Sequence, residues 1–284
     1  TSLEKRFANG LNFNANYTWS HCRSDAGDSL NGSGNSGSRA IGLPGYGIQG
    51  AYTDCDFNIF NVFHFSGGYV LPVGSGRHFL TNSRGATNAL LGGWQMVWNA
   101  TVEGGQPFGI GCPHGTSGDY GCNALTIPGQ SLYGSGVPDH YLNAAAFTQA
   151  CPAPGFTQPS TCVPISLPST LGAPVGKTDL LCGIACVGLL GGNPNQVTGP
   201  GIARLDFSLF KEFRLSERFR MEFRSEFFNI LNHPTFNAPG FGGNGVVAVS
   251  GSTNYTSTNF GKIGSTRFPF QDPRQIQFAL KLYF

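Results

Sequence analysis

Residues 272–284 read D-P-R-Q-I-Q-F-A-L-K-L-Y-F. From residue 276 onward, apolar side chains occupy every second position, and the positions between them are mostly polar. A period of two over this length predicts a β-strand whose two faces meet different environments. In a water-soluble sheet, such an uncovered apolar strand would invite aggregation. An apolar face turned outward and a polar face turned inward, over about ten residues, is typical of a barrel wall in lipid.

The composition of the chain favours the same class of structure. Charged residues make up 11% of the sequence, whereas about 25% is usual for soluble proteins. The chain has 42 glycines and 24 phenylalanines, which suits lipid-facing aromatics and glycine-rich loops better than a soluble enzyme. A net charge of +2 without a basic stripe argues against a nucleic-acid partner. We find no motif for catalysis or for a cofactor, and we expect neither an enzyme nor a cofactor site.

Hydrophobic runs and the first residues bear on membrane insertion and processing. No run approaches the 18 apolar residues of a membrane-spanning helix. The opening T-S-L-E-K-R-F lacks the apolar segment of a secretory signal peptide. Because the strands nevertheless indicate a membrane barrel, we expect the chain to be a fragment of a longer protein.

Alternating segments recur along the chain and predict an all-β, antiparallel transmembrane barrel fragment of about seven strands. The predicted strands are 3–7, 11–20, 57–71, 94–103, 202–214, 218–227 and the final segment. A short helical turn is expected at 86–91. We treat residues 1–284 as part of one barrel domain with a long extracellular loop insertion at about 106–200.

The connections between these strands sort by length. Counted back from the last strand, the long irregular stretches 21–56, 106–200 and 232–267 all fall on one side. The shorter connections 8–10, 72–93 and 215–217 fall on the other side. Outer-membrane barrels have long extracellular loops and short periplasmic turns, so this order predicts the topology.

Charged residues concentrate on one face of the hairpin 202–227. They are Arg204, Asp206, Glu212, Arg218, Arg220, Glu222, Arg224 and Glu226. A charge on the lipid face would cost about 2–4 kcal/mol at mid-depth, so this face is predicted to line a wet lumen. Two interpretations remain open: a wall that contacts substrate or plug, and plain cross-strand charge pairing. On the opposite face, Lys211 is the one charged exception.

All the cysteines lie in the predicted long loops. They are Cys22, Cys55, Cys112, Cys122, Cys151, Cys162, Cys182 and Cys186. An even number on one side of a membrane favours disulfides in an oxidising compartment. We expect neighbours to pair, with Cys22 bonded to Cys55 across the first loop. Zinc is the weaker alternative, with Cys112, His114 and Cys122 as three possible ligands.

Several motifs carry a resemblance to a known family. They are R-L-D-F-S-L-F-K-E-F (204–213), R-F-R-M-E-F-R-S-E-F-F-N-I-L-N-H-P-T-F (218–236), F-G-K-I-G-S-T-R (260–267) and the final strand. Together they resemble the C-terminal end of TonB-dependent outer-membrane receptors. The greatest similarity is to the Oar-like, acidobacterial group, which carries a carboxypeptidase-regulatory-like domain. Stretches 3–20, 90–95 and 104–108 are also similar to this group, whereas about 109–199 is not.

The resemblance implies a location, a function and partners. The implied function is energy-coupled uptake, across the outer membrane, of a bulky nutrient such as a glycan or metal chelate. The implied partners are outer-membrane lipid, the rest of the barrel and its plug, the barrel assembly machinery and an inner-membrane energy-coupling complex. The alternating side chains Phe278, Leu280, Leu282 and Phe284 are similar to the C-terminal signal for barrel insertion. A non-transporting barrel, either an adhesin or a passive porin, is the alternative, and a secreted soluble β-domain is a third.

Overall fold

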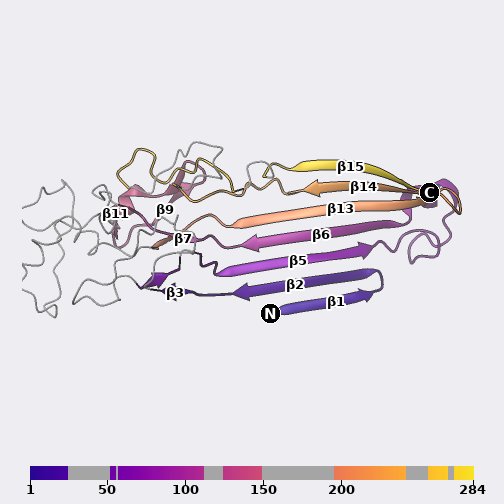
Figure 1. Cartoon of the computed structure of the whole chain (residues 1–284), viewed down its shortest axis with the longest axis horizontal. Coiled ribbons are helices and arrows are strands. Elements are labelled where there is room, and N and C mark those ends of the chain that lie inside the picture. Colours follow the sequence, from indigo (N-terminus) through magenta and orange to yellow (C-terminus); the bar gives the residue numbers. More distant parts are fainter. Residues whose placement is uncertain (25–51, 56, 112–123, 149–194, 241–254, 268–271) are drawn as a thin grey trace, which may run out of the picture.

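A single antiparallel sheet dominates the computed structural model, which describes residues 1–24, 52–55, 57–111, 124–148, 195–240, 255–267 and 272–284. Its seven strands follow one another in chain order (Figure 1). They are β1 (Ser2–Ala8), β2 (Leu11–Trp19), β5 (Asn61–Val70), β6 (Trp94–Glu103), β13 (Ile202–Arg214), β14 (Arg220–Phe228) and β15 (Gln275–Tyr283). The predicted fold class and the predicted seven strands are confirmed.

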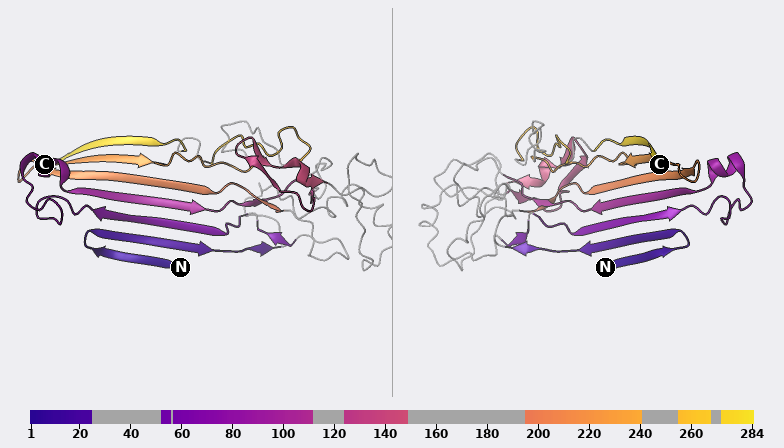
Figure 2. Two further views of the ribbon diagram at one scale, coloured as in Figure 1. Left: turned by 180° about the vertical axis from the view of Figure 1, so that it is seen from behind. Right: turned by 45° about the vertical axis from the view of Figure 1, so that its right-hand side comes forward.

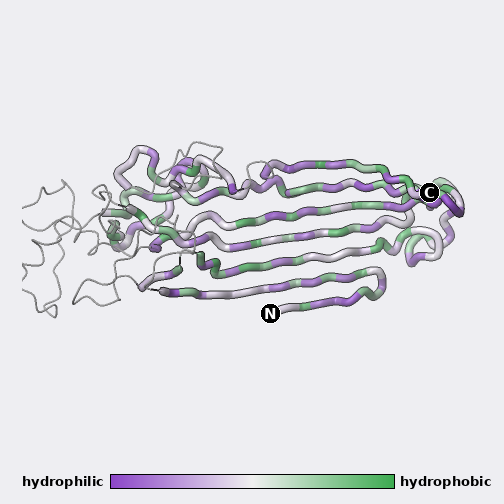
Figure 3. Tube along the Cα trace, viewed as in Figure 1, coloured by the Kyte–Doolittle hydropathy of each residue, from purple (hydrophilic) through white to green (hydrophobic). Residues whose placement is uncertain are grey.

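Cross-strand register gathers the apolar positions of all seven strands on one face of the sheet. Phe207 pairs with Trp98 on one side and with Phe227 on the other. Phe223 in turn pairs with Leu280 of the last strand. Figure 3 shows hydrophilic and hydrophobic residues intermixed along the strands, and because side chains alternate along each strand, this register leaves the second face polar.

Two glycines show how closely the strands pack. Gly67 pairs with Trp98, and a Cβ added at Gly67 would lie 2.6 Å from the indole ring. The ring therefore covers the gap that a glycine leaves in a strand. Between β1 and β2, Asn9 and Gly10 both have positive φ, as the predicted Asn-Gly turn requires.

The ends of two strands differ from the prediction. β5 begins at Asn61 and not at 57, because the chain before it turns, with the Asn58 backbone N–H donating to the carbonyl of Cys55 at 3.0 Å. β14 begins at Arg220, and Arg218 lies in the preceding turn. There the Ser216 hydroxyl accepts hydrogen bonds from the backbone N–H groups of Arg218 and Phe219. Arg218 is therefore wrongly predicted as a strand residue of the charged wall.

The connections fall at opposite ends of the sheet as predicted. The turn 9–10, the connection 71–93 and the turn 215–219 lie at the end where the C-terminus lies (Figure 2). The long connections all leave from the other end, which we call the loop end. The helical turn expected at 86–91 is present as helix α1 (Gly85–Leu91).

Described parts of the loops fold into small paired strands rather than an irregular chain. The pairs are β3 (Arg23–Ser24) with β4 (Thr53–Asp54), β7 (Pro107–Phe108) with β12 (Val197–Thr198), β8 (Leu125–Thr126) with β11 (Phe147–Thr148), and β9 (Tyr133–Gly136) with β10 (His140–Leu142). A 3₁₀ turn, η1 (Ala144–Ala146), leads into β11. Elements of two to four residues are too short to show a period, so the sequence pattern did not indicate them.

Candidate functional site

The loop end holds the packed hydrophobic core of the described residues. We call this unit the cap. Its buried cluster consists of Phe108, Ile110, Ala124, Leu142, Ala146, Phe147, Val197 and Phe260. None of these side chains belongs to the seven-stranded sheet. The cap is thus a folded unit with its own core, placed where long loops surround the mouth of a barrel.

Hydrogen bonds between different connections hold the cap together. The Tyr141 backbone N–H donates to the carbonyl of Gly261 at 3.0 Å, and that of Ile263 donates to Pro138 at 2.8 Å. Phe147 and Phe260 meet edge to face at 5.5 Å. The second and third long connections therefore form one body, although they are far apart in the sequence.

Two tyrosine hydroxyls bind the backbone of Thr198 in β12, which pairs with β7 where the cap joins the sheet. The Tyr141 hydroxyl donates to the carbonyl of Thr198 at 2.6 Å, and the Tyr133 hydroxyl accepts from the Thr198 N–H at 2.9 Å. Burial raises the pKa of Tyr141 far above its ordinary value, with a smaller contribution from Tyr133. Tyr141 therefore remains a neutral hydrogen-bond donor at every physiological pH.

Arg267 links the cap to the first residues of β13. Its guanidinium donates to the carbonyl of Pro200 at 3.0 Å, and its backbone N–H donates to Thr235 at 2.7 Å. Burial lowers the pKa of Arg267, while the nearby Glu103 carboxylate opposes that shift. This partly buried guanidinium ties the third long connection to the residues that lead into β13.

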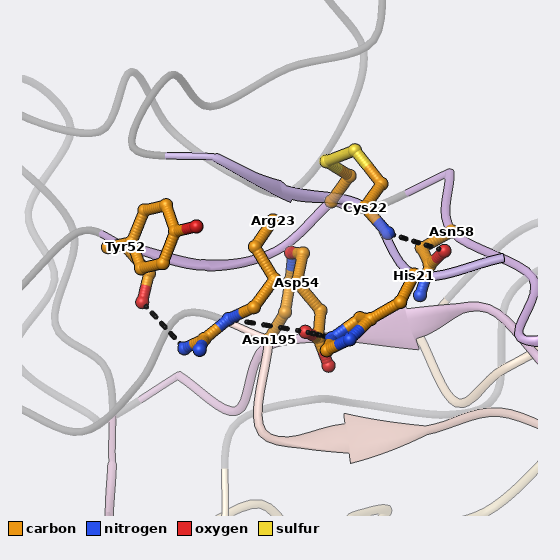
Figure 4. A network of polar contacts seen from close by, with 8 residues as sticks. His21, Cys22, Arg23, Tyr52, Asp54, Asn58 and Asn195 are labelled. Carbon is orange, nitrogen blue, oxygen red and sulfur yellow. Dashed lines mark hydrogen bonds and ion pairs between the residues drawn. A yellow bond between two sulfur atoms is a disulfide. The ribbon is translucent and has the colours of Figure 1, made fainter.

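The first long connection joins the cap through a polar cluster around Asp54 (Figure 4). His21 Nε2 lies 2.9 Å from Asp54 Oδ1, and Arg23 Nε lies 3.7 Å from the same oxygen. The Asn195 side chain donates to the Asp54 backbone carbonyl at 2.6 Å. The Arg23 guanidinium also lies over the Tyr52 ring, 4.7 Å from its centroid. The cluster is exposed and presents cationic and aromatic groups together at the loop end.

A disulfide between Cys22 and Cys55 closes the base of this connection. This pairing confirms the prediction for these two cysteines. The remaining candidates, Cys112, Cys122, Cys151, Cys162, Cys182 and Cys186, lie outside the described residues, as does His114 of the zinc alternative. Within the described ranges, no group of histidine, cysteine and carboxylate side chains could hold a metal ion.

We expect removal of the disulfide to loosen the first connection and to leave the sheet intact. Cys22→Ser with Cys55→Ser frees 33 residues of chain that the bond now closes. Proteolysis followed by mass spectrometry should then show cleavage at Arg23, which lies beside the disulfide in the β3–β4 pair and which the unmodified protein protects. Reduction of the unmodified protein should reproduce this cleavage. Unchanged resistance in both cases would mean that other contacts suffice to hold the connection.

The polar face of the sheet has two chemically different halves. Over β2, β5 and β6 it is lined mainly by amides and hydroxyls, with Asn12, Asn14, Asn16, Ser66, Asn99 and Thr101 as members. An open hollow of ≈ 710 Å³ lies over this half, and its lining includes Asn12, Asn14, Ser66, Gly68 and Asn99. His64 also projects here, with Nδ1 3.1 Å from the Thr101 hydroxyl. This half offers both hydrogen-bond donors and acceptors, and the charged residues Glu4, Lys5 and Arg6 of β1 also line the hollow.

The second half, over β13 to β15, carries the predicted charged residues. Glu212 and Glu222 face each other across two strands. Arg224 pairs with Glu222 and lies 4.0 Å from Glu226, while Arg220 lies 3.4 Å from Glu212. Most of these pairs join residues two apart on one strand, so the predicted cross-strand pairing is represented mainly by Arg220 with Glu212. Arg204 and Asp206 form a separate pair, with 3.0 Å between them, near the loop end.

Asn229 is a structural centre that the sequence pattern did not reveal. Its side chain is 1% exposed, donates to the carbonyls of His233 and Asp272, and accepts from the His233 N–H. Its backbone N–H donates to the Asp206 carboxylate at 2.8 Å. Asp206, predicted as a wall residue, thus also holds the exit of β14. The sequence feature that could have pointed to Asn229 is the motif Asn-x-x-Asn-His-Pro (229–234), which directly follows a two-faced strand.

We expect Asn229→Gly to destabilise the loop end by roughly 1–3 kcal/mol, because it leaves buried polar groups without partners. Glycine keeps the positive φ of 48° at this position, so the loss reports the side-chain hydrogen bonds. Asn232→Gly is the matched control, since Asn232 has φ 51° and its side chain accepts one exposed hydrogen bond, from the Arg274 N–H. Denaturant unfolding followed by tryptophan fluorescence measures both variants. Equal effects would contradict a central role for Asn229.

Comparison with known protein families gives one match, which covers nearly the whole chain. Residues 1–277 match the family described as "Outer membrane beta barrel domain". No curated protein and no solved structure matches the chain. Among the described residues, no helix has the length and hydrophobicity needed to cross a membrane.

Proposed function

This chain belongs to the outer membrane beta barrel domain family and is located in the outer membrane, and from this premise we propose that it is part of a TonB-dependent receptor for a bulky nutrient. In this proposal the seven strands form one arc of a larger barrel. The apolar face contacts lipid, the polar face lines the lumen, and the cap lies on the extracellular side. The barrel is completed by further strands and by a plug coupled to the inner-membrane energy complex.

The open sheet is the observation that carries this proposal. Among the described residues, the seven strands pair only with their neighbours in the sheet, so β1 and β15 each have one edge without a partner strand. A barrel in lipid has no open edge, and bacterial single-chain barrels have an even number of strands. Further strands are therefore needed to close the barrel. Because the diameter of a barrel grows with its number of strands, a barrel with many more than seven strands would be wide enough to hold a plug, as the proposal requires.

The chemistry of the polar face supports a solute path rather than an ion-selective pore. Its charged half is largely neutralised by its own pairs, among them Arg224 with Glu222. Its amide half surrounds an open hollow whose lining combines amide and hydroxyl groups with Glu4, Lys5 and Arg6 of β1, and Glu4 and Arg6 lie 3.7 Å apart as an ion pair. Among the nutrient classes that the resemblance suggests, these groups match the hydroxyls of a glycan better than the charge of a metal chelate.

Two measurements on the full protein test the proposal. In proteoliposomes, a plugged receptor should give no swelling in small sugars, whereas a passive porin would admit them. In cells, uptake of the nutrient should stop when the proton-motive force is dissipated. Swelling in small sugars without an energy source would contradict the proposal and favour a porin. A closed barrel that promotes attachment but shows no energy-dependent uptake would favour an adhesin.

A further inference from the structure

The connection 71–93 forms a compact unit at the end of the sheet opposite the cap, and we call it the α1 connection. The Asn88 side chain accepts hydrogen bonds from the Ser75 backbone N–H at 2.7 Å and from the Ser83 hydroxyl at 3.3 Å. Gly74 packs against Gly92 so closely that a Cβ at Gly74 would lie 2.7 Å from the Gly92 Cα. The connection is therefore a folded element of defined shape, and its surface residues have defined positions.

Lys211 fixes the α1 connection to the apolar side of the sheet. In β13, Lys211 pairs with Trp94 and Phe223, which places it on the apolar face. Its ammonium group donates to the carbonyl oxygens of Gly92 and Asn88, where the C-terminal end of α1 is electronegative. Lys211 is only 3% exposed, so its charge is covered. The indole N–H of Trp94 donates to the Leu90 carbonyl at 2.8 Å and adds a second attachment.

The outer surface of the α1 connection is strongly apolar. Four large side chains are exposed in it: Phe79 at 57%, Leu80 at 46%, Leu90 at 68% and Leu91 at 52%. A compact turn that faced only water would not be expected to gather such side chains. Since Lys211 and Trp94 hold α1 at the edge of the apolar face, this surface continues the apolar face of the sheet.

The charges of the α1 connection have one sign. Residues 71–93 contain Arg77, Arg84 and His78, and they contain neither aspartate nor glutamate. Apolar side chains combined with exposed basic ones are typical of segments that lie in the headgroup region of a membrane. The basic residues of such segments attract anionic lipids.

We propose that the α1 connection is an interfacial anchor that binds the phospholipid leaflet at the end of the sheet where the C-terminus lies. Leu90 and Leu91 enter the boundary between headgroups and acyl chains, and Arg77 and Arg84 bind anionic phospholipid headgroups. The anchor fixes the depth of β5 and β6, which the α1 connection joins. This inference rests on the proposed assignment of the apolar face to lipid, which the following experiment tests in parallel.

The experiment uses the full protein with a photo-reactive benzophenone amino acid at one position at a time, in bilayers of phosphatidylcholine and phosphatidylglycerol. Position 90 tests the anchor, and position 278 on the apolar face of β15 tests lipid contact of the sheet. Position 217 is the control, because Glu217 lies in the exposed turn at the same end of the sheet. Mass spectrometry of the adducts identifies phospholipid attached at each position.

We expect lipid adducts at positions 90 and 278 and none at position 217. Adducts at position 90 should be enriched several-fold in phosphatidylglycerol over its share of the bilayer, and Arg77→Gln with Arg84→Gln should abolish this enrichment. Adducts at 278 without adducts at 90 would overturn the anchor and leave the orientation of the sheet intact. Absence of adducts at both positions would overturn the lipid assignment itself. Enrichment that survives the arginine substitutions would overturn the role of the arginines.

Discussion

Replacement of Ile110 by alanine is expected to open the cap while the sheet remains folded. Ile110 is fully buried at 0% exposure, in the cluster that includes Phe147 and Phe260. Removal of a buried isoleucine to the β-carbon costs about 2–5 kcal/mol, because apolar contacts are lost and a cavity remains. The cost falls on the cap alone, because none of the residues in this cluster belongs to the sheet.

Protease susceptibility of the assembled protein measures this effect. If opening of the cap precedes cleavage, a loss of about 2 kcal/mol raises the cleavage rate in residues 104–111 and 124–148 about thirtyfold. Ile127→Ala is the matched control: it removes the same atoms from a side chain that is 36% exposed. Cleavage in the sheet strands should not increase in either variant. A rate for Ile110→Ala close to that of Ile127→Ala would show that the cap does not depend on a packed core.

The sheet could be predicted from the sequence because its strands are long and two-faced. Nine to thirteen alternating residues in strands such as β13 and β15 show a clear period. The separation of long and short connections then gave the same topology that the structure shows. The strand period is a local pattern, and the topology follows from the order of long and short connections. Both can be read from a single sequence.

The cap and the residues that hold it could not be predicted in the same way. Its strands are too short for a period, and its core joins connections more than one hundred residues apart, as Phe108 and Phe260 show. Lys211 was visible only as a charge on an apolar face, since its partner carbonyls lie 119 and 123 residues away. Arg218 was misplaced because the turn formed by Ser216 extends the alternating pattern beyond the strand.

Unequal effects of one substitution on the two faces of β15 are the second large expected result. Phe278 is 68% exposed on the apolar face and pairs with Ser225. If this face contacts lipid, Phe278→Arg places a charge near mid-depth and costs about 2–4 kcal/mol. The neighbouring Gln277 pairs with Glu226 on the polar face. Gln277→Arg adds the same side chain beside a carboxylate and should change stability by less than about 1 kcal/mol.

The two arginine variants form a matched pair, because the same residue enters adjacent positions of one strand. An effect of the new charge that depended only on strand propensity or on net charge would be the same at both positions. The comparison also tests whether the charged face lines a wet lumen, since Glu212, Glu222, Arg224 and Glu226 lie on the same face as Gln277. The difference between the two variants therefore reports the environment of each face.

The most direct test of the lipid-facing assignment is the free energy of unfolding of the full protein in lipid bilayers, measured by denaturant titration for both variants. The account predicts that Phe278→Arg loses about 2–4 kcal/mol while Gln277→Arg stays within about 1 kcal/mol of the unmodified protein. A greater loss for Gln277→Arg than for Phe278→Arg would contradict it, because the polar face would then be the one in contact with lipid.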